Sequence, residues 1–137
     1  MQLKDIMQPK VVTVTADGSL WEVKMLFENT KFHHLLVTDD KKLVGVVSDR
    51  DYLKAASPNL NQQATTAADG ATLNQRVSSI MSTQLKTLAA EDSILDAITL
   101  FNQANISCIP IVDHDMNIEG IISWRDIMKL MYEKMNK

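Results

Sequence analysis

Gly45-Val46-Val47-Ser48-Asp49-Arg50-Asp51 and Gly120-Ile121-Ile122-Ser123-Trp124-Arg125-Asp126 are two copies of one pattern. In each copy a glycine and two β-branched residues precede a serine, which is followed three residues later by an aspartate. β-Branched residues favour strands, and a serine with an acidic residue three positions on is typical of a helix N-terminus. The pattern therefore predicts two places where a strand leads directly into a helix.

The likeness of the two copies extends over most of the chain. Upstream residues match at a shift of 74, and one residue is inserted in the second copy before Gly120. Ordered matches with a single gap indicate an internal duplication, because chance does not produce them in series. The identical pairs include Ile6-Met7 with Ile80-Met81, Thr13 with Thr87, Ala16 with Ala90, Ser19 with Ser93, and Leu26-Phe27 with Leu100-Phe101.

Each copy is predicted to run strand, helix, strand, strand, helix, after a short helical piece. Apolar residues at helical spacing predict the first helix, and Ser19–Glu22 and Ser93–Asp96 have the form of capping boxes. In the first copy the expected segments are Leu3–Met7, Val11–Thr15, a helix from Leu20, Phe32–Thr38, Leu43–Val47 and a helix from Ser48. In the second copy they are Thr72–Met81, Leu85–Ala89, a helix from Ile94, Ile106–Val112, Ile118–Ile122 and a helix from Ser123.

This order predicts an α/β fold (α+β in some schemes), with two βαββα repeats whose short sheets are flanked by helices. One repeat alone would bury too little surface to be stable, so the two are expected to pack together. We assign residues 1–56 to the first repeat, 57–71 to a linker and 72–137 to the second repeat. The stretch 55–71 is rich in Ala, Asn, Gln, Thr and Ser and lacks apolar periodicity, as linkers do.

Composition excludes several classes of protein. The 137 residues are 45% hydrophobic, which is typical of a globular chain, and the formal net charge of −3 argues against binding to nucleic acid. No apolar run approaches the roughly 20 residues of a membrane helix, and no signal peptide is visible. Cys108 is the single cysteine and has no partner for an internal disulfide. We therefore expect a cytoplasmic protein that does not bind membranes.

The duplicated unit and its two Gly-x-x-Ser-x-x-Asp motifs resemble a tandem pair of CBS domains (the cystathionine-β-synthase repeat), as found in small stand-alone bacterial proteins. The resemblance covers the chain apart from the linker. It implies two repeats packed with pseudo-twofold symmetry, two clefts, and a homodimer formed through helices. It also implies that the clefts bind adenosine derivatives such as AMP, ADP, ATP or S-adenosylmethionine. We expect no other domain to be fused to the pair, so binding would then regulate a separate partner protein.

The repeated motif suits a nucleotide on chemical grounds. A serine hydroxyl beside free backbone N–H groups at a helix N-terminus, as at Ser48 and Ser123, is able to hold a phosphate. Arg50 and Arg125 offer a charged fork to the same group. The carboxylates of Asp51 and Asp126 are able to accept two hydrogen bonds from the paired hydroxyls of a ribose. In the family that this chain resembles, the aspartate holds ribose and the serine approaches phosphate.

The resemblance places the adenine against the first extended segment and the start of the middle strand. The proline common in that strand is present as Pro110 in the second repeat, whereas the first has Leu36, which predicts a differently shaped first site. The implied adenine positions are Thr13, Val14, His34 and Leu35 in the first repeat and Thr87, Leu88, Cys108, Ile109 and Pro110 in the second.

Several of these residues are also compatible with a structural role. Ser-x-x-Asp is also a capping box, so Asp51 and Asp126 could cap in the empty state and turn to a ligand on binding. Gly45 and Gly120 allow the close approach of either a ligand or another backbone segment. Trp124 is compatible with shielding a ligand, stacking on a base or joining a dimer contact.

Other residues point to structure more than to chemistry. His33 and His34 are adjacent, and neighbours on a strand face opposite ways, so we expect no metal site. Cys108 is expected to be a buried small hydrophobe, and Met128, Met131 and Met135 to pack in the core or a dimer, with partner recognition left open. No nucleophile with a base and no phosphate-binding GxxxxGK[ST] loop is present, so we expect no enzyme.

We therefore expect a regulatory module that senses an adenosine nucleotide and needs no cofactor. The absence of an extra Lys or Arg cluster favours AMP or ADP over ATP and S-adenosylmethionine. The alternative is a scaffold that dimerises without ligand and whose clefts are vestigial.

Overall fold

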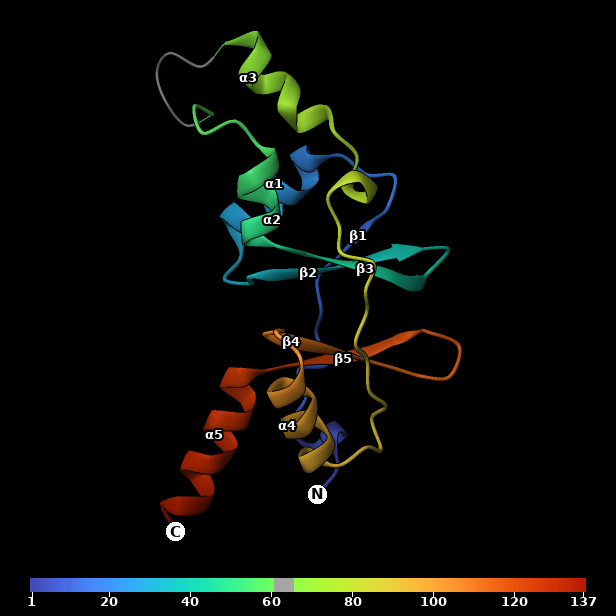
Figure 1. Ribbon diagram of the computed structural model, residues 1–137, viewed down its shortest axis with the longest axis vertical. Helices are drawn as coiled ribbons and strands as arrows, with labels where there is room; N and C mark the ends of the chain where they lie inside the picture. The colour runs from blue at the N-terminus through green and yellow to red at the C-terminus, as the bar shows by residue number, and fades with distance from the viewer. Residues whose placement is uncertain (61–65) are drawn as a thin grey trace. The chain divides into compact units, whose positions relative to one another are not determined.

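A computed structural model of the chain describes residues 1–60 and 66–137, which form two compact units (Figure 1). One unit is Val12–Leu85, and the other combines Met1–Val11 with Lys86–Lys137. The spatial units therefore differ from the sequence copies. The segment that opens each copy folds into the unit built from the strands of the other copy. Of the expected linker 57–71, residues 61–65 lie outside the described part.

The unit Val12–Leu85 is a three-stranded sheet covered by helices on one face (Figure 1). The strand order is β1-β2-β3, with β1 parallel to β2 and β2 antiparallel to β3. The mixed α/β class and the strand-helix-strand-strand-helix order are confirmed. The elements are β1 (Thr13–Thr15), α1 (Leu20–Asn29), β2 (His34–Asp39), β3 (Lys42–Ser48), α2 (Asp49–Ala55), α3 (Ala67–Ala71), η2 (Thr72–Asn74) and η3 (Val77–Ser79).

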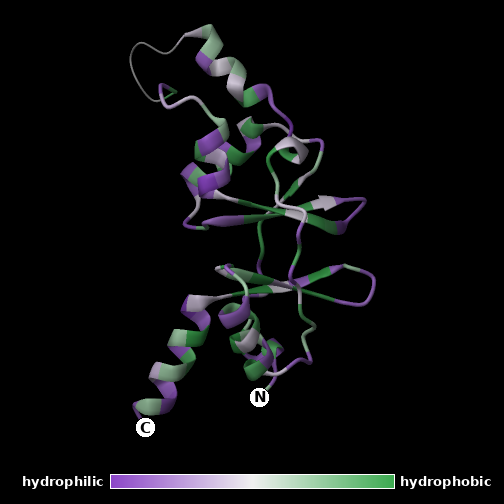
Figure 2. Cartoon of the chain, viewed as in Figure 1, coloured by the Kyte–Doolittle hydropathy of each residue, from purple (hydrophilic) through white to green (hydrophobic). Residues whose placement is uncertain are grey.

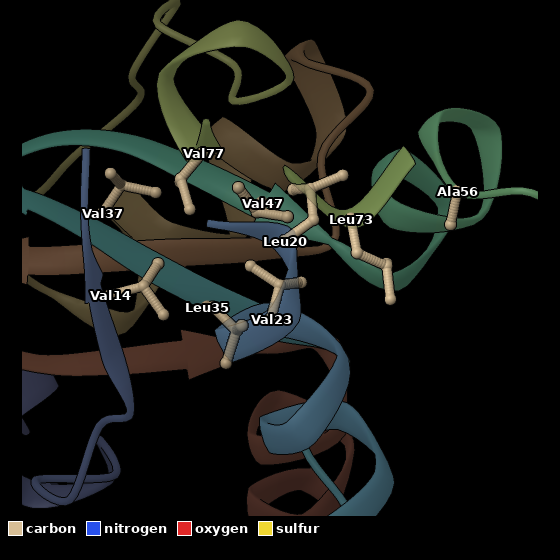
Figure 3. Packing of buried hydrophobic residues seen from close by; sticks show 9 residues of the cluster. All are labelled: Val14, Leu20, Val23, Leu35, Val37, Val47, Ala56, Leu73 and Val77. Atoms are coloured by element: carbon tan, nitrogen blue, oxygen red, sulfur yellow. The ribbon is translucent and has the colours of Figure 1, made fainter. Parts of the chain in front are cut away.

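The core of this unit lies between the sheet and its helices (Figure 3). Alternate residues of β3 are buried, as expected for a strand with one covered face. The opening segment of the second copy contributes Leu73 and Val77, which are both fully buried. The cluster consists of Val14, Leu20, Val23, Leu35, Val37, Val47, Ala56, Leu73 and Val77.

The second unit repeats this plan with a shorter sheet. Strands β4 (Cys108–Val112) and β5 (Ile118–Ser123) pair antiparallel, and every residue of β4 is buried. The remaining elements are η1 (Leu3–Asp5), α4 (Ile94–Gln103) and α5 (Trp124–Met135). The core cluster consists of Leu3, Ala90, Ala97, Phe101, Ile109, Ile111, Ile122 and Ile127. Leu3 thus fills the core of the unit that holds the second copy's strands.

The predicted strand Leu85–Ala89 is wrong in extent, because only Leu88 pairs, with Ile111. In the first copy the N–H of Leu36 donates to Val12 O over 3.2 Å. The residue equivalent to Leu36 is Pro110, which has no N–H and cannot donate the matching bond. Two hydrogen bonds remain, from Leu88 N to Pro110 O and from Val112 N to Leu88 O.

Two smaller expectations also need correction. Thr72–Met81 is not one helical piece but two 3₁₀ turns, η2 and η3, and the opening helix is shorter than expected, at Leu3–Asp5. The expected linker contains a helix, α3, capped by Thr66 and Asp69.

The Ser19–Glu22 capping box does not form, although Ser19 is the N-cap of α1. The N–H of Leu20 instead donates to Gln75 O over 3.0 Å, and Ser19 lies in an antiparallel bridge with Arg76. A remote backbone segment therefore satisfies the helix end. The equivalent Ser93–Asp96 box forms as predicted.

Candidate functional site

The start of α2 holds Ser48 and Asp51 in a reciprocal pair. The N–H of Ser48 donates to Asp51 Oδ2 over 2.9 Å, and the N–H of Asp51 donates to Ser48 Oγ over 3.1 Å. Both residues are half-buried. The capping box predicted from the sequence is therefore present, and it also brings the two side chains implicated in nucleotide binding together.

The start of α5 repeats the arrangement with Ser123 and Asp126. Ser123 donates to Asp126 Oδ2 from its backbone N–H over 2.8 Å and from its hydroxyl over 3.2 Å. A third donor comes from the other end of the chain, since Gln8 Nε2 lies 3.1 Å from Asp126 Oδ1. Both carboxylate oxygens of Asp126 are thus hydrogen-bonded.

Asp126 also lines a cleft of about 200 Å³. Lys129, Leu130 and Glu133 follow it on the same face of α5, because residues three, four and seven positions apart lie together on a helix. Ligand pockets for drug-sized molecules span about 300–1,000 Å³, so this cleft has room for part of a nucleotide. Its lining residues are Asp5, Ile6, Gln8, Asp126, Lys129, Leu130 and Glu133.

The β2–β3 register sets His34 directly opposite Ser48. Burial lowers the pKa of His34, with the Asp49 carboxylate acting in the opposite direction. The neighbouring His33 contacts Asp49 twice: His33 Nδ1 lies 3.0 Å from Asp49 Oδ2, and His33 O accepts from Asp49 N over 2.9 Å. Arg50 is exposed on the first turn of α2. The register thus brings one imidazole, that of His34, next to Ser48, while His33 is held by Asp49.

The other residues expected around the adenine in the first repeat are not brought to Ser48 and Asp51. The side chains of Val14 and Leu35 are 4% and 0% exposed and belong to the hydrophobic core. Thr13 pairs with Leu36 rather than with His34. Of the four residues expected around the base in this repeat, the β-sheet register brings only His34 to Ser48.

In the second repeat the register sets Cys108 opposite Ser123, Ile109 opposite Ile122 and Pro110 opposite Ile121. The side chain of Ile109 is fully buried in the core. Arg125 is exposed on the first turn of α5.

Thr87 and Leu88 line a different cleft from Asp126. That cleft has a volume of about 650 Å³ and shares no lining residue with the cleft at Asp126. Four carboxylates line it, and hydrogen bonds from Asn117 hold the pKa of one of them, Asp113, below its usual value. This concentration of negative charge opposes a phosphate. The four acidic residues are Glu91, Asp92, Asp113 and Glu119.

The two motif glycines are approached by backbone. Gln8 exchanges hydrogen bonds with Ile121 beside Gly120, over 2.9 and 3.0 Å. Ser82 exchanges them with Val46 beside Gly45, over 2.9 and 3.1 Å. The close approach of another chain segment, one of the two interpretations given above for these glycines, is therefore present in both repeats.

Cys108 is a buried small hydrophobe, as predicted. Burial raises the pKa of its thiol to about 12, so the group stays protonated and weakly nucleophilic at neutral pH. Within residues 1–60 and 66–137, no cluster of three His, Cys, Asp or Glu side chains could hold a metal ion. The same ranges contain no helix long and apolar enough to cross a bilayer.

Trp124 packs against its own unit while remaining 48% exposed. Its ring lies 5.2 Å from that of Phe101, and its Nε1 donates to Ile106 O over 3.3 Å.

Sequence reasoning missed Gln8 and Lys129 as neighbours of Asp126. The repeat alignment contained a signal for Gln8, which directly follows Ile6-Met7 just as Ser82 follows Ile80-Met81. Lys129 was visible as the residue three positions after Asp126 on the predicted helix.

Known proteins share this architecture. The uncharacterized protein MJ0188 of Methanocaldococcus jannaschii is 26% identical over 136 residues, which cover 98% of this chain and 45% of the relative. The chain spans less than half the length of the curated relatives it matches.

Two solved structures match over nearly the whole chain. The crystal structure of CBSX2 in complex with AMP is 25% identical, with a TM-score of 0.80 and 98% of each chain covered. The CBS domain pair of protein MJ0100, in complex with 5′-methylthioadenosine and S-adenosyl-L-methionine, is 24% identical, with a TM-score of 0.79 and 98% of each chain covered.

The family model described as CBS domain matches this sequence twice, over residues 3–58 and 77–133. These two ranges contain both Gly-x-x-Ser-x-x-Asp motifs and both opening Ile-Met segments. The chain therefore belongs to the CBS domain family and carries two CBS domains.

Proposed function

We propose that this CBS domain pair is a regulatory module that binds an adenosine nucleotide, with AMP or ADP preferred, and acts on a separate partner protein. The observation that carries the proposal is the recurrence of one serine–aspartate arrangement at the helix start of each repeat. CBSX2, which matches along the whole chain, is known in complex with AMP. In each repeat the aspartate would hold the ribose, and the serine and arginine would meet the phosphate.

Charge supports a ligand with few phosphates. The cleft at Asp126 has one cationic side chain, Lys129, and two further carboxylates, Asp5 and Glu133. A triphosphate would meet net negative charge there, whereas a ribose presents only hydroxyl groups. Each repeat also offers one exposed arginine on the first turn of its motif helix, Arg50 in the first and Arg125 in the second.

The proposal includes a homodimer formed through helices. Apolar side chains remain uncovered along α5, where polar and apolar residues alternate (Figure 2). Contiguous exposed apolar surface is typical of an interaction site. The exposed apolar residues of α4 and α5 are Leu95, Ile98, Trp124, Met128, Met131, Tyr132 and Met135.

The test is a calorimetric and thermal-shift screen of the full chain against AMP, ADP, ATP, S-adenosylmethionine and NADH, with GTP as the control ligand. A ligand that binds only the native state raises the melting temperature by mass action. We expect AMP or ADP to raise it, and Asp126→Ala and Asp51→Ala each to remove binding at one site.

Asp96→Ala is the matched control, because Asp96 caps α4 in the same way but lies in neither motif. All three variants lose a cap, which costs about 1 kcal/mol of stability. Loss of binding in the motif variants but not in Asp96→Ala supports nucleotide recognition. Equal binding in all three, or no shift with any adenosine compound at millimolar concentration, contradicts the proposal.

A second candidate function is a scaffold that dimerises without ligand. The observation in its favour is that the carboxylates of Asp51 and Asp126 already cap their own helices. This alternative predicts a stable dimer whose melting temperature no nucleotide changes.

A further inference from the structure

The side chain of Gln8 donates a hydrogen bond to Asp126, the carboxylate that the proposed ribose site requires. Gln8 Nε2 donates to Asp126 Oδ1 over 3.1 Å, across 118 residues of sequence. The backbone of Gln8 is held beside β5, because it exchanges two hydrogen bonds with Ile121. The amide therefore reaches Asp126 from a well-anchored segment, and both residues line the same cleft.

Most of the hydrogen-bond acceptor positions on the Asp126 carboxylate are already filled by donors of the protein. An ionised carboxylate offers about four lone-pair positions. Oδ2 accepts from the N–H and the hydroxyl of Ser123, and Oδ1 accepts from Gln8. A ribose diol that donates from both hydroxyls needs two open positions, so it has to displace one of these donors.

The first repeat has a serine in place of this glutamine. The residue equivalent to Gln8 is Ser82, which makes the same two backbone hydrogen bonds, here with Val46. Serine is too short to reach across as the glutamine amide does. Among the described residues, the hydrogen bond that Asp51 accepts on its carboxylate is from Ser48 N, at Oδ2. The first carboxylate is therefore open to a diol where the second is partly occupied.

We propose that Gln8 is a specificity-determining residue of the second adenosine site, where its amide competes with ribose hydroxyls for Asp126 and makes this site weaker than the first. The inference rests on the proposed nucleotide-binding function. The two sites then fill in order, so that the module responds to two ranges of nucleotide concentration.

Calorimetry with AMP tests the inference on chains in which one site is removed. On an Asp51→Ala background, which leaves the second site, Gln8→Ala is expected to tighten AMP binding about 3- to 10-fold, the worth of one exposed hydrogen bond. On an Asp126→Ala background, Gln8→Ala is expected to change nothing, because the competing acceptor is absent. Ser82→Ala on the Asp126→Ala background is the matched control and is expected to leave AMP affinity unchanged.

A ligand without the diol separates competition from simple steric hindrance. With 2′,3′-dideoxyadenosine monophosphate, the gain from Gln8→Ala should disappear, since no hydroxyl competes for Asp126. The reciprocal variant Ser82→Gln, on the Asp126→Ala background, should weaken AMP binding at the first site.

The outcomes distinguish this inference from the function on which it rests. If AMP binds the unaltered chain but Gln8→Ala weakens binding or leaves it unchanged, the competition is overturned and the nucleotide function stands. An equal gain with the dideoxy nucleotide also overturns it. If neither the unaltered chain nor Gln8→Ala binds any adenosine compound, both proposals fail together.

Discussion

The carbonyl oxygen of Gln8 lies directly against Gly120: a Cβ on this glycine would stand 2.8 Å from it. At the equivalent Gly45, the nearest obstacle is the thioether of Met81, at 2.6 Å, and the nearest backbone atom is Ser82 O, at 3.1 Å. A methionine side chain moves aside more easily than a paired backbone carbonyl. The two glycines are therefore needed for the approach of the exchanged opening segments.

From this geometry, Gly120→Ala should destabilise the protein by about 1–3 kcal/mol, and more than Gly45→Ala does. Urea unfolding followed by circular dichroism measures both changes. Gly70→Ala is the control, because a Cβ there meets nothing within 4 Å and alanine favours the helix α3. Equal stability of all three variants would contradict a packing role for Gly45 and Gly120.

Cys108 should make stability fall at alkaline pH. Burial raises the pKa of the folded thiol to about 12, whereas an unfolded thiol titrates near pH 8.5–9. Above pH 9 the unfolded chain releases this proton while the folded chain keeps it, so unfolding becomes more favourable as pH rises toward 12. The unfolding free energy should thus drop by about 1.5 kcal/mol between pH 8 and pH 10 relative to Cys108→Ala, which lacks the titrating group. Parallel pH profiles for the two proteins, measured by urea unfolding, would refute this account.

The β2–β3 turn contains strain that a single substitution should relieve. Asp40 and Lys41 have φ values of 51° and 66°, a region that costs L-residues about 1–2 kcal/mol. Lys41→Gly should therefore stabilise the protein by about 1 kcal/mol, and so should Met116→Gly, at φ 66° in the β4–β5 turn. Asp115→Gly in the same turn is the control and should bring no gain. Melting temperatures of the three variants test this prediction, and no rise for Lys41→Gly and Met116→Gly over Asp115→Gly would contradict it.

The exposed methionines of α5 give the homodimer a direct test. Met128 and Met131 are 59% and 46% exposed, so a charge at either position hardly disturbs the core of the unit. We expect sedimentation to show a dimer for the unaltered chain and a monomer for Met131→Glu, because a dimer would bury the new carboxylate unpaired. Lys134→Glu, on the same helix, should stay dimeric. A monomeric unaltered chain at micromolar concentration would remove the dimer from the proposal.

Sequence reasoning was most accurate where structure is decided over three or four residues. The Ser48–Asp51 and Ser93–Asp96 boxes form as predicted, since their partners are adjacent on one turn of helix. The strand and helix order followed from the spacing of apolar residues, which depends on local geometry. The Ser19–Glu22 box has the same form but is absent, and the backbone carbonyl of Gln75, far away in sequence, accepts from Leu20 N at this helix end.

The sequence by itself determined that the chain is a duplicated βαββα unit of the CBS family with a serine–aspartate pair at each motif. Only the tertiary structure decided that the opening segments exchange between units, that backbone lies against Gly45 and Gly120, and that Gln8 reaches Asp126. The physical reason is the sequence distance between the partners. Caps and periodicities arise from neighbours, whereas a contact across 118 residues exists only after the whole chain has packed.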